Sequence, residues 1–594
     1  MAVAGWYDTD RWQLGSCQLG AGSQSSPKRG VKLWDDPARN INHFKETSRM
    51  MKSDSVRDTP FLEKHEFIIP FILFALFLIF TLPGISWGAP SIWHPDEVVY
   101  IALRGLFEGI EFDAANFNHP HLPIYAMYWL GKILIALGQT GKEVLIGARV
   151  LSAVMTGLTI LLAYLIPRRM GYNLYVSALS ALLLLSVSEL PHNARFAHND
   201  TFVTFFCALT IFFLVQYIAK NHRGWLYVAF FGAGMAVSSK YIAISLVLVP
   251  IIVFLWTKGK AVLKISLNTF ETLFIGGALT YLGYAVGTPK ALTWMVYYFK
   301  RLIPALIYNS NYGVQPDSVR GVIGQYTVFL DAVGLPLFLL CMVAFLWGIY
   351  KILQAYQAKS LNEEKYRGLL LLTILVLDLP IMVSYNYPTR FFLPLMPFFA
   401  ILSALFIRDL YSLAVQSPNS IYPKLIGTGL ALILLFSLAR SVSVMLLFLN
   451  DPRIPATQFV ASLPSSASLE HTEYPPTIPE NHFEREHNYP IHFRNTPDEP
   501  LLTSKNYVYN IGEEGLDDRQ TTYLVIDSFT VDKFNSAYNC ELMQVECDFF
   551  KQLAAGASAH YKLIADFSYQ LPPFLPQLEI SFVNPQIRIY ERVP

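Results

Sequence analysis

Charged residues are scarce in this sequence. Only 15% of the 594 residues are Asp, Glu, Lys or Arg, whereas 53% are hydrophobic and 14% are aromatic. An average soluble domain has about 25% charged residues, so this composition excludes an ordinary soluble protein and indicates a membrane protein with many spans. The net charge of +1 provides no basic surface for nucleic acid, and we expect no such partner.

Cysteine is also rare, and several common motifs are missing. The sequence has no P-loop, no GxGxxG after a strand and no tandem repeat. Of its five cysteines, Cys207 and Cys341 lie in apolar runs and are expected to be inert. Cys540 and Cys547 are seven residues apart in the polar tail. They either form a disulfide, if the tail is extracytoplasmic, or remain two free thiols.

Long apolar runs occupy most of the chain. A membrane span needs about 20 such residues. Eleven runs qualify, at 67–86, 144–166, 173–190, 200–219, 225–239, 241–257, 266–287, 326–350, 368–385, 391–410 and 422–448. A further run at 121–138 would make twelve. The basic residues in the polar segments between the runs decide whether residues 121–138 cross the membrane.

The basic residues fix the predicted topology. Four short loops rich in Lys and Arg should be cytoplasmic; they lie at 168–169, 220–223, 258–264 and 351–367. All four fall inside only if 121–138 lies along the interface as an amphipathic helix. The sequence therefore predicts eleven spans, a cytoplasmic N-terminus, and one long external loop at 87–142 that holds two juxtamembrane helices.

Three regions follow from this topology. Residues 1–65 are predicted to be a flexible cytoplasmic arm, 66–449 the membrane domain, and 450–594 an extracytoplasmic domain. Alternating strand patterns such as TYLVID and YKLIADF indicate a small α+β fold for the tail. Neither end shows a catalytic motif, and both the arm and the tail are candidates for contact with a partner.

The first external loop contains an adjacent carboxylate pair, Asp96 and Glu97. The pair could simply begin a helix, with Asp96 as its cap and Glu97 as a partner of its dipole. Alternatively, partial desolvation at a bilayer boundary would suit a carboxylate to work as a general base. His94, His119 and His121 are nearby candidates for metal ligands, although histidines beside prolines often serve only to shape a loop.

Three separate cations are predicted on the same face. Arg195 lies five residues before Asp200, and the two could form a salt bridge, or Arg195 could bind a phosphate. Lys240 ends the stretch GAGMAVSSK, whose small residues would let two short helices approach closely, and it could snorkel to the interface. Arg390 lies in YNYPTRFFLPLMPF, where prolines interrupt the start of a span. Cations converging beside a carboxylate suit a donor whose leaving group is a phosphate.

In order and spacing these motifs resemble the protein O-mannosyltransferase family, which has the GT-C fold, and its bacterial relatives that use polyprenyl-phosphate sugars. The matching positions are Asp96 with Glu97, His119 to Leu122, Arg195 with Asp200, Gly232 to Tyr241, and Arg390 to Pro397. His121 replaces the second proline of the family's His-Pro-Pro-Leu stretch. The loop 288–325 is too short for the sugar-binding insertion of eukaryotic members, so a protein acceptor does not follow.

The resemblance implies a membrane glycosyltransferase that moves a sugar from a polyprenyl-phosphate carrier to an acceptor on the outer face, with inversion. Asp96 would be the general base, and Glu97 would orient Asp96 or the acceptor. The residues expected to neutralise the leaving phosphate or to support the site are Arg195, Lys240, Arg390, Asp200, His119 and His121. In this scheme Asp200 would hold Arg195.

Several alternatives stay open at this level. The acceptor could be a protein, a lipid or a glycan, and a divalent metal is possible. The chain could also be a non-enzymatic scaffold subunit with a GT-C-like fold, or a transporter of lipids or sugar-lipids. A transporter should place its ionisable groups near the bilayer midplane, whereas those of this sequence are predicted at one face.

Overall fold

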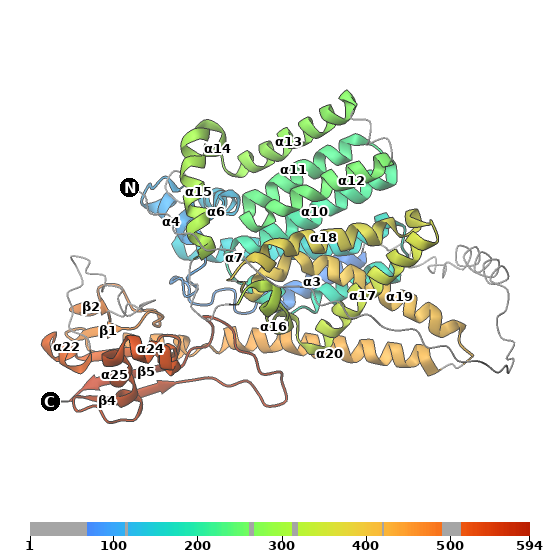
Figure 1. Cartoon of the computed structure of the whole chain (residues 1–594). Helices are drawn as coiled ribbons and strands as arrows, with labels where there is room; N and C mark the ends of the chain where they lie inside the picture. Colours follow the sequence, from blue (N-terminus) through green and yellow to red (C-terminus); the bar gives the residue numbers. More distant parts are fainter. Residues whose placement is uncertain are drawn as a thin grey trace, which may run out of the picture. The chain divides into compact units, whose positions relative to one another are not determined.

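A computed structural model describes residues 68–112, 117–259, 266–311, 319–385, 387–418, 421–489 and 512–593 (Figure 1). The predicted cytoplasmic arm lies outside the described residues. The regions of the chain that are described are predominantly helical, with one small sheet near the C-terminal end. The division into a membrane domain and a tail domain at residue 450 stays a prediction.

Seven helical segments of the described chain are long and apolar enough to cross a membrane. They are α7 (Gly141–Met170), α10 (Asn199–Lys220), η1 with α12 (Tyr241–Lys258), α17 (Leu335–Gln357), η3 with α18 (Leu361–Val383), η4 with α19 (Thr389–Gln416), and α20 with α21 (Ile421–Ala461). The described chain is thus built as a multi-pass membrane protein.

Other helices lie within the remaining predicted spans or between them. Four are apolar but shorter: α3 (Ile68–Thr81), α6 (Leu122–Ala136), α8 (Leu174–Leu185) and α16 (Gly321–Val333). The rest of this part of the chain contains α4 (Val99–Phe107), α9 (Glu189–Asn193), α11 (Arg223–Ser239), α13 (Leu267–Gly287), α14 (Lys290–Thr293) and α15 (Met295–Asn311). Every predicted run overlaps a helix, but the total of eleven spans stays a prediction.

The predicted run at 326–350 is not one helix. It is divided between α16 and α17 at Gly334, which has a φ of +80°. Glycine adopts this left-handed region without the steric penalty that a Cβ would bring. Apolar periodicity continued through the break, so hydropathy alone did not reveal it.

Small residues allow α11 and α13 to pack with their backbones close together. A Cβ at Gly234 would lie 2.0 Å from the carbonyl oxygen of Thr280, and one at Gly283 would lie 2.2 Å from that of Phe231. The stretch GAGMAVSSK was expected to permit such an approach, and α13 is its partner. This contact fixes the C-terminal end of α11, which Lys240 directly follows.

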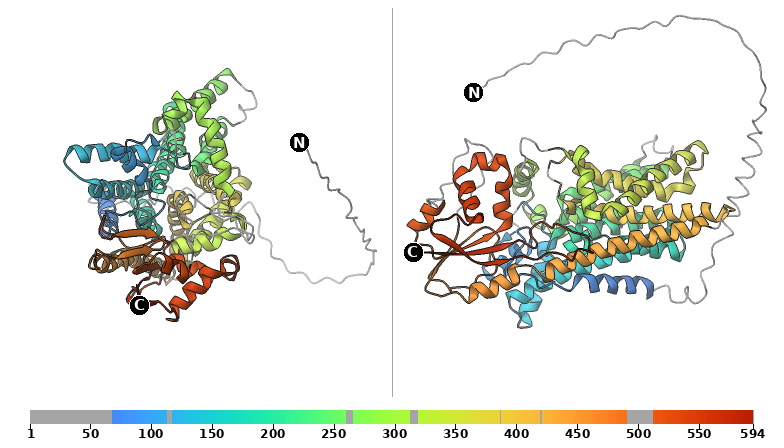
Figure 2. Two further views of the ribbon diagram at one scale, coloured as in Figure 1. Left: turned by 90° about the vertical axis from the view of Figure 1, so that its left-hand side faces the viewer. Right: turned by 90° about the horizontal axis from the view of Figure 1, so that it is seen from below.

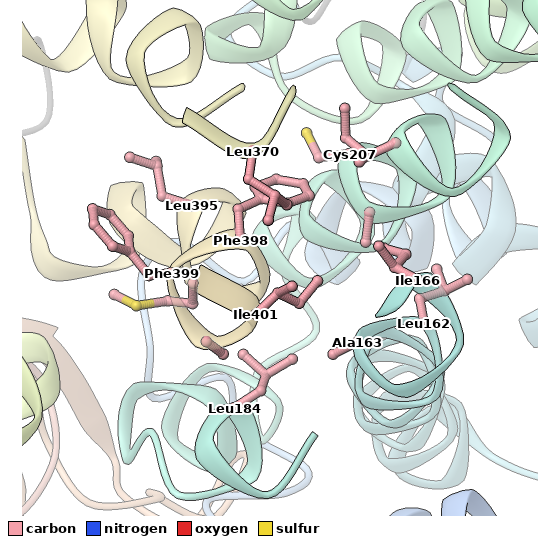
Figure 3. Close-up of a cluster of buried hydrophobic side chains, with 14 of the residues drawn as sticks. Leu162, Ala163, Ile166, Leu184, Cys207, Leu370, Leu395, Phe398, Phe399 and Ile401 are labelled. Carbon is pink, nitrogen blue, oxygen red and sulfur yellow. The ribbon is translucent and has the colours of Figure 1, made fainter. Parts of the chain in front are cut away.

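The main hydrophobic core joins the central helices (Figure 3). Leu162 and Ile166 of α7, Leu184 of α8 and Phe398 and Ile401 of α19 meet there as buried side chains. Cys207 and Cys341 are buried in the same core, as expected of inert thiols. The core holds in place the helix ends from which the polar residues described below project.

Two helices of the first external loop, α4 and α6, pack against each other and against α7. In Figure 2 the lighter blue segment that contains them lies across the direction of the long helices, whereas α3, in darker blue, runs along it. A helix that rests on a membrane surface would have this orientation, and the interfacial placement of 121–138 stays a prediction.

The tail forms a five-stranded sheet in the order β2-β1-β3-β5-β4. Its strands are β1 (Ser468–His471), β2 (Arg485–Asn488), β3 (Tyr523–Asp527), β4 (Tyr561–Phe567) and β5 (Ile587–Arg592). The pairs β2–β1 and β1–β3 are parallel, whereas β3–β5 and β5–β4 are antiparallel. The strands predicted at TYLVID, YKLIADF and QIRIYERV are β3, β4 and β5.

Short helices cover this sheet and carry its disulfide. They are α22 (Gly512–Asp518), α23 (Ser528–Val531), η5 (Asp532–Asn535), α24 (Ala537–Leu542) and α25 (Gln544–Ala554). Phe549 and Phe550 of α25 pack in one core with Leu524 of β3 and Tyr590 of β5. Cys540 and Cys547 form a disulfide and are therefore not two free thiols. The five-stranded sheet and its helices confirm the predicted α+β fold of the tail.

Candidate active site

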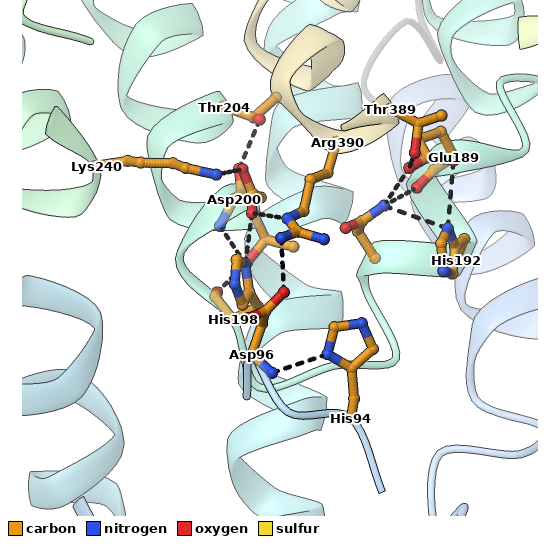
Figure 4. A network of polar contacts seen from close by, with 12 residues as sticks. His94, Asp96, Glu189, His192, His198, Asp200, Thr204, Lys240, Thr389 and Arg390 are labelled. Carbon is orange, nitrogen blue, oxygen red and sulfur yellow. Dashed lines mark hydrogen bonds and ion pairs between the residues drawn. The ribbon is translucent and has the colours of Figure 1, made fainter. Parts of the chain in front are cut away.

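Four charged side chains from distant parts of the chain form one network (Figure 4). Nζ of Lys240 lies 2.5 Å from Oδ1 of Asp200, and a guanidinium nitrogen of Arg390 donates to Oδ2 of Asp96 at 2.6 Å. Nε of Arg390 also lies 3.8 Å from Oδ2 of Asp200. Arg390 therefore joins the two carboxylates. The sequence predicted Arg195, Lys240 and Arg390 together beside Asp96, whereas in the structure Lys240 and Arg390 meet Asp96 and Asp200 in one network that Arg195 does not join.

Each member of this network stands at the end of a helix. Asp96 lies in the turn before α4, and Asp200 is in the first turn of α10, where the helix dipole favours a negative charge. Lys240 has extended backbone between α11 and η1, and Arg390 lies in the first turn of η4, after Pro388. Proline and interrupted helices thus place the polar groups at helix ends rather than along helix faces.

Burial differs sharply among the four side chains. Asp200 is inaccessible, Lys240 is 15% exposed, Arg390 is 23% exposed and Asp96 is 35% exposed. The Lys240 ammonium also lies over the ring of Phe391, 4.3 Å from its centroid. Asp96 is consequently the carboxylate that an incoming molecule can reach, whereas Asp200 serves as the buried counter-charge that holds two cations in position.

Glu97 points away from this network. Its carboxylate forms a fully buried two-point ion pair with Arg149 of α7, at 2.7 and 3.1 Å. The backbone N–H of Ala197 donates to the same carboxylate at 3.4 Å. Glu97 thereby fixes the loop that carries Asp96 onto α7. Of the two roles expected for Glu97, this geometry fits orientation of Asp96 rather than of the acceptor.

Arg195 is buried and does not contact Asp200. Its guanidinium donates to the backbone carbonyl oxygens of Pro83 at 3.1 Å, Pro191 at 2.6 Å and Phe80. Burial lowers the pKa of Arg195 to about 9. This arrangement ties the loop before α10 to the end of α3, and it replaces the predicted pairing of Arg195 with Asp200.

The three predicted histidines lie near the network in different ways. Nδ1 of His94 accepts a hydrogen bond from the backbone N–H of Asp96 at 3.1 Å. Burial is the main cause that lowers the pKa of His119 to about 4, and the charges of His198, Asp96, Lys240 and Asp200 also act on it. The ring of His121 contacts Phe112 and Tyr298. His94 thus shapes the turn of Asp96, while the charges of the network act on His119.

The structure gives no support to a metal site in the described ranges. Among the residues placed between 68 and 593, no group of three or more His, Cys, Asp or Glu side chains is arranged to hold a metal ion. His94 uses Nδ1 for the Asp96 turn, so only its other ring nitrogen remains for a ligand. The metal requirement therefore stays a question for experiment.

Some participants were missed at the sequence level. Nδ1 of His198 lies 2.5 Å from Oδ2 of Asp200. Oγ1 of Thr389 donates to the buried carboxylate of Glu189 at 2.7 Å, directly beside Arg390. Arg149 had a recognisable signal, since a lone arginine inside an apolar run is a functional or structural marker. The contact of Glu189 with Thr389 had no such signal, because the two are remote in sequence. His198 lies only two residues before Asp200, and its pairing was overlooked.

A cavity of about 650 Å³ adjoins the external loop. Its lining comes from α4, the segment before α6, and α15; it includes Tyr100, Arg104, Phe117, Asn118, Tyr297 and Arg301. Asn118 immediately precedes His119. The cavity thus combines two guanidinium groups with several aromatic rings.

Comparison with known proteins supports the resemblance seen in the motifs. Residues 134–306 match the model of the family described as dolichyl-phosphate-mannose-protein mannosyltransferase. An undecaprenyl phosphate-alpha-4-amino-4-deoxy-L-arabinose arabinosyl transferase 1 of Pseudomonas fluorescens Pf0-1 is 31% identical over 208 residues, 32% of this chain and 34% of that protein. A type 2 enzyme of P. fluorescens Pf-5 is 36% identical over 149 residues, 24% of each chain. The matched stretches thus span about a third or less of these relatives.

Two solved structures are similar at a more distant level. ArnT from Cupriavidus metallidurans bound to undecaprenyl phosphate aligns with a TM-score of 0.46 and 14% identity, over 87% of this chain and 97% of that one. The Pmt1-Pmt2 protein O-mannosyltransferase complex of S. cerevisiae bound to the sugar donor aligns with a TM-score of 0.31 and 20% identity, over 41% of this chain and 34% of that one.

Proposed function

We propose that this chain is a GT-C-type membrane glycosyltransferase that transfers a sugar from a polyprenyl-phosphate carrier to an acceptor hydroxyl on the extracytoplasmic face. The observation that carries the proposal is the network of Asp96, Arg390, Asp200 and Lys240, in which the most exposed carboxylate pairs with Arg390 and buried Asp200 joins Arg390 to Lys240. The family match over 134–306 and the named activity of the Pseudomonas relatives support the same conclusion.

Asp96 is the proposed general base. It would take the proton of the acceptor hydroxyl as that oxygen attacks the anomeric carbon, while the bond from this carbon to the phosphate oxygen breaks. A single displacement of this kind inverts the anomeric configuration. The partial exposure of Asp96 lets an acceptor approach, and its hydrogen bond with Arg390 at 2.6 Å holds the carboxylate in place.

Lys240 and Arg390 are the proposed partners of the leaving phosphate. Negative charge grows on the phosphate as its bond to the sugar breaks, and fixed cations stabilise that charge. An arriving phosphate would draw the Arg390 guanidinium from Asp96 and so release the carboxylate as a base. Asp200 would hold both cations throughout, because it is buried between them.

The cavity beside α4 and α15 suits the carrier's headgroup. Arg104 and Arg301 can attract the anionic carrier before its phosphate reaches Lys240 and Arg390, and the aromatic rings offer apolar surface to the sugar and the first prenyl units. We assign Arg195 to positioning rather than to phosphate binding, because carbonyl oxygens of the chain occupy its guanidinium. We assign Glu97 to positioning because it is fully paired with Arg149.

The proposed orientation places the N-terminus in the cytoplasm and the tail outside. It keeps the basic loops cytoplasmic, and it puts the network on the face where a lipid-linked donor is used. The clustering of Asp96, Lys240 and Arg390 favours an enzyme over a scaffold or a transporter, although Arg195, expected in the same cavity, does not join them. The relatives' names suggest 4-amino-4-deoxy-L-arabinose as one donor sugar to test.

The test uses the purified full-length protein with a membrane extract as the source of acceptors. Undecaprenyl-phosphate-linked 4-amino-4-deoxy-L-arabinose and polyprenyl-phosphate mannose are supplied in turn, with and without a chelator, and products are identified by mass. We expect sugar transfer with one of the two donors. Asp96→Asn should lower turnover by roughly 10²- to 10⁴-fold while its melting temperature stays unchanged. Turnover near the wild-type rate in Asp96→Asn would refute its role as base.

A further inference from the structure

Three aromatic side chains of the tail gather beside the Asp96 loop. The ring centroids of Tyr474 and Phe582 are 5.2 Å apart, and Phe529 lies 6.0 Å from Tyr474 and 6.1 Å from Phe582. Tyr474 lies in the loop after β1, Phe529 in the short helix α23 after β3, and Phe582 in the loop before β5. All three are partly exposed. We call Tyr474, Phe529 and Phe582 the aromatic wall.

The aromatic wall is directly connected to the proposed base. The ring of Phe582 packs against the ring of His94, with centroids 5.1 Å apart. Nδ1 of His94 in turn accepts the hydrogen bond from the backbone N–H of Asp96. Burial raises the pKa of Tyr474, and the charges of Glu473, Asp527 and Asp96 add to this effect. The tail therefore reaches the turn that carries Asp96.

The backbone of Phe582 is held in an unfavourable conformation. Phe582 and Asn584 have φ angles of +64° and +65°, a region that residues with side chains rarely adopt. The Arg453 guanidinium donates to the carbonyl oxygen of Phe582 at 2.8 Å, and the backbone N–H of Asn584 donates to Asp451 at 2.9 Å. Strain of this kind persists where surrounding contacts impose it, and it is typical of functional sites.

A buried ion pair anchors this turn to the membrane domain. Arg453 and Asp451 are fully buried and pair at 2.8 Å. Nε1 of Trp87 donates to Asp451 at 2.9 Å, and the Arg453 guanidinium lies over the rings of Trp87 and Trp93. Because Trp87 and Trp93 belong to the loop that carries Asp96, this anchor fixes the position of Phe582 relative to that carboxylate.

A second buried carboxylate orients the other two rings. Asp527 accepts a hydrogen bond from the backbone N–H of Tyr474 at 3.0 Å and another from that of Thr530 at 2.8 Å. These bonds fix the loops that carry Tyr474 and Phe529. At the edge of the wall, Glu473 and Lys533 lie 3.2 Å apart and are 56% and 38% exposed. The wall thus offers apolar faces bordered by a hydrogen-bond acceptor and a donor.

This combination of groups matches the chemistry of a sugar ring. A pyranose presents C–H groups on one face, which pack on aromatic rings, and hydroxyls around its edge, which bond to charged side chains. We propose that the aromatic wall is the acceptor-binding surface of the active site and that it takes a sugar ring, so that the acceptor is a glycan or the headgroup of a glycolipid. This inference rests on the proposed function, because it needs the acceptor to meet Asp96.

The test compares acceptor and donor kinetics in the full-length protein. The donor is the one that the wild type uses, and the acceptor is the glycolipid and glycan fraction of a membrane extract, titrated at saturating donor. We expect Tyr474→Ala and Phe529→Ala each to raise the apparent KM for the acceptor about 3- to 10-fold. The KM for the donor should not change. Phe574 is an exposed aromatic side chain of the tail outside the wall, and Phe574→Ala, the matched control, should behave like the wild type.

The outcomes separate this inference from the proposed function. If the wild type transfers sugar but both alanine variants keep its acceptor KM, the aromatic wall has no binding role and only this inference fails. A product that is a protein or a sugar-free lipid would also overturn it. If the variants lose melting temperature and both KM values shift together, the wall merely packs the tail. A wild type that transfers nothing contradicts the proposed function itself.

Discussion

The Asp96 carboxylate lies 2.6 Å from the Arg390 guanidinium, although 294 residues separate them in the chain. Asp96 precedes the short helix α4, and Arg390 lies in the 3₁₀ turn η4 before α19. The pair closes a group of charges in which Arg390 also lies 3.8 Å from buried Asp200. One guanidinium is therefore shared between the accessible carboxylate and the inaccessible one.

Loss of this shared guanidinium should affect the reaction more than the fold. We expect Arg390→Ala to lower kcat by about 10²- to 10³-fold, because one preorganised charge at a developing anion contributes to this extent. Arg390→Lys should recover only part of the activity, since an ammonium does not contact two carboxylates as a guanidinium does. Steady-state kinetics with the polyprenyl-phosphate donor measure both variants. Equal rates in Arg390→Ala and wild type would exclude Arg390 from the reaction.

The buried pair of Glu97 and Arg149 should behave as a structural element. Glu97→Gln leaves the Arg149 charge buried without its counter-ion, which costs about 3–5 kcal/mol of stability. The double variant Glu97→Leu with Arg149→Met removes both charges and should recover much of the melting temperature. Thermal unfolding in detergent measures the variants. If Glu97→Gln instead keeps its melting temperature and loses turnover, Glu97 acts on the substrate and our positioning assignment is wrong.

The close approach of α11 and α13 provides a test of the packing that positions Lys240. A methyl group at Gly234 would collide with the Thr280 carbonyl oxygen, so Gly234→Ala should destabilise the protein by about 1–3 kcal/mol. Gly277 of α13 faces open space, and Gly277→Ala should be neutral or stabilise by up to about 1 kcal/mol. The melting temperatures of the two variants are the measurement. If both melting temperatures fell equally, the contact between α11 and α13 would not be the cause of the destabilisation.

Acidification should weaken the fold through His119. Its pKa of about 4 in the folded chain lies below the 6.5 of an unperturbed histidine, so protonation favours unfolding. The stability is complete above about pH 6.5 and falls as the pH drops toward 4. At pH 5 the titration of His119 should lower the free energy of unfolding by the equivalent of about 1.5 pKa units, on the order of 2 kcal/mol.

His119→Gln removes that titration and is the matched variant. Its melting temperature should fall less between pH 7.5 and pH 5 than that of the wild type. The comparison uses the difference between the two proteins, because other groups titrate in both. Parallel curves for the two proteins would contradict the lowered pKa of His119.

Several features of the molecule were predictable because they depend on local patterns. Apolar runs located the helices, and a single charge near the end of a run drew attention to Asp96, Asp200, Lys240 and Arg390. Alternation along the tail indicated β3, β4 and β5. The division at Gly334 was missed, because hydropathy does not change where a single glycine redirects the backbone.

The partners of the charges could not be predicted in the same way. Arg195 and Asp200 are five residues apart, and their proximity suggested a pair. In the folded chain Arg195 instead binds carbonyl oxygens of α3 and its own loop, while Asp200 meets Lys240 and Arg390. Glu97, adjacent to Asp96, faces the opposite way toward Arg149. Side chains that are adjacent in sequence can point in different directions, and no local sequence pattern indicates the direction of each.

The sequence by itself determined that this is a helical membrane protein with a small α+β tail, and which ionisable side chains stand at the ends of its helices. These properties follow from hydropathy and periodicity, which act over a few turns of chain. Only the tertiary structure decided that Asp96 shares Arg390 with Asp200. It also decided that Glu97 and Arg195 hold buried loops in place, and that Phe582 packs on His94. Such contacts depend on how remote helices and loops pack. A buried charge is stable only when it is paired, and the packing decides which partner lies within reach.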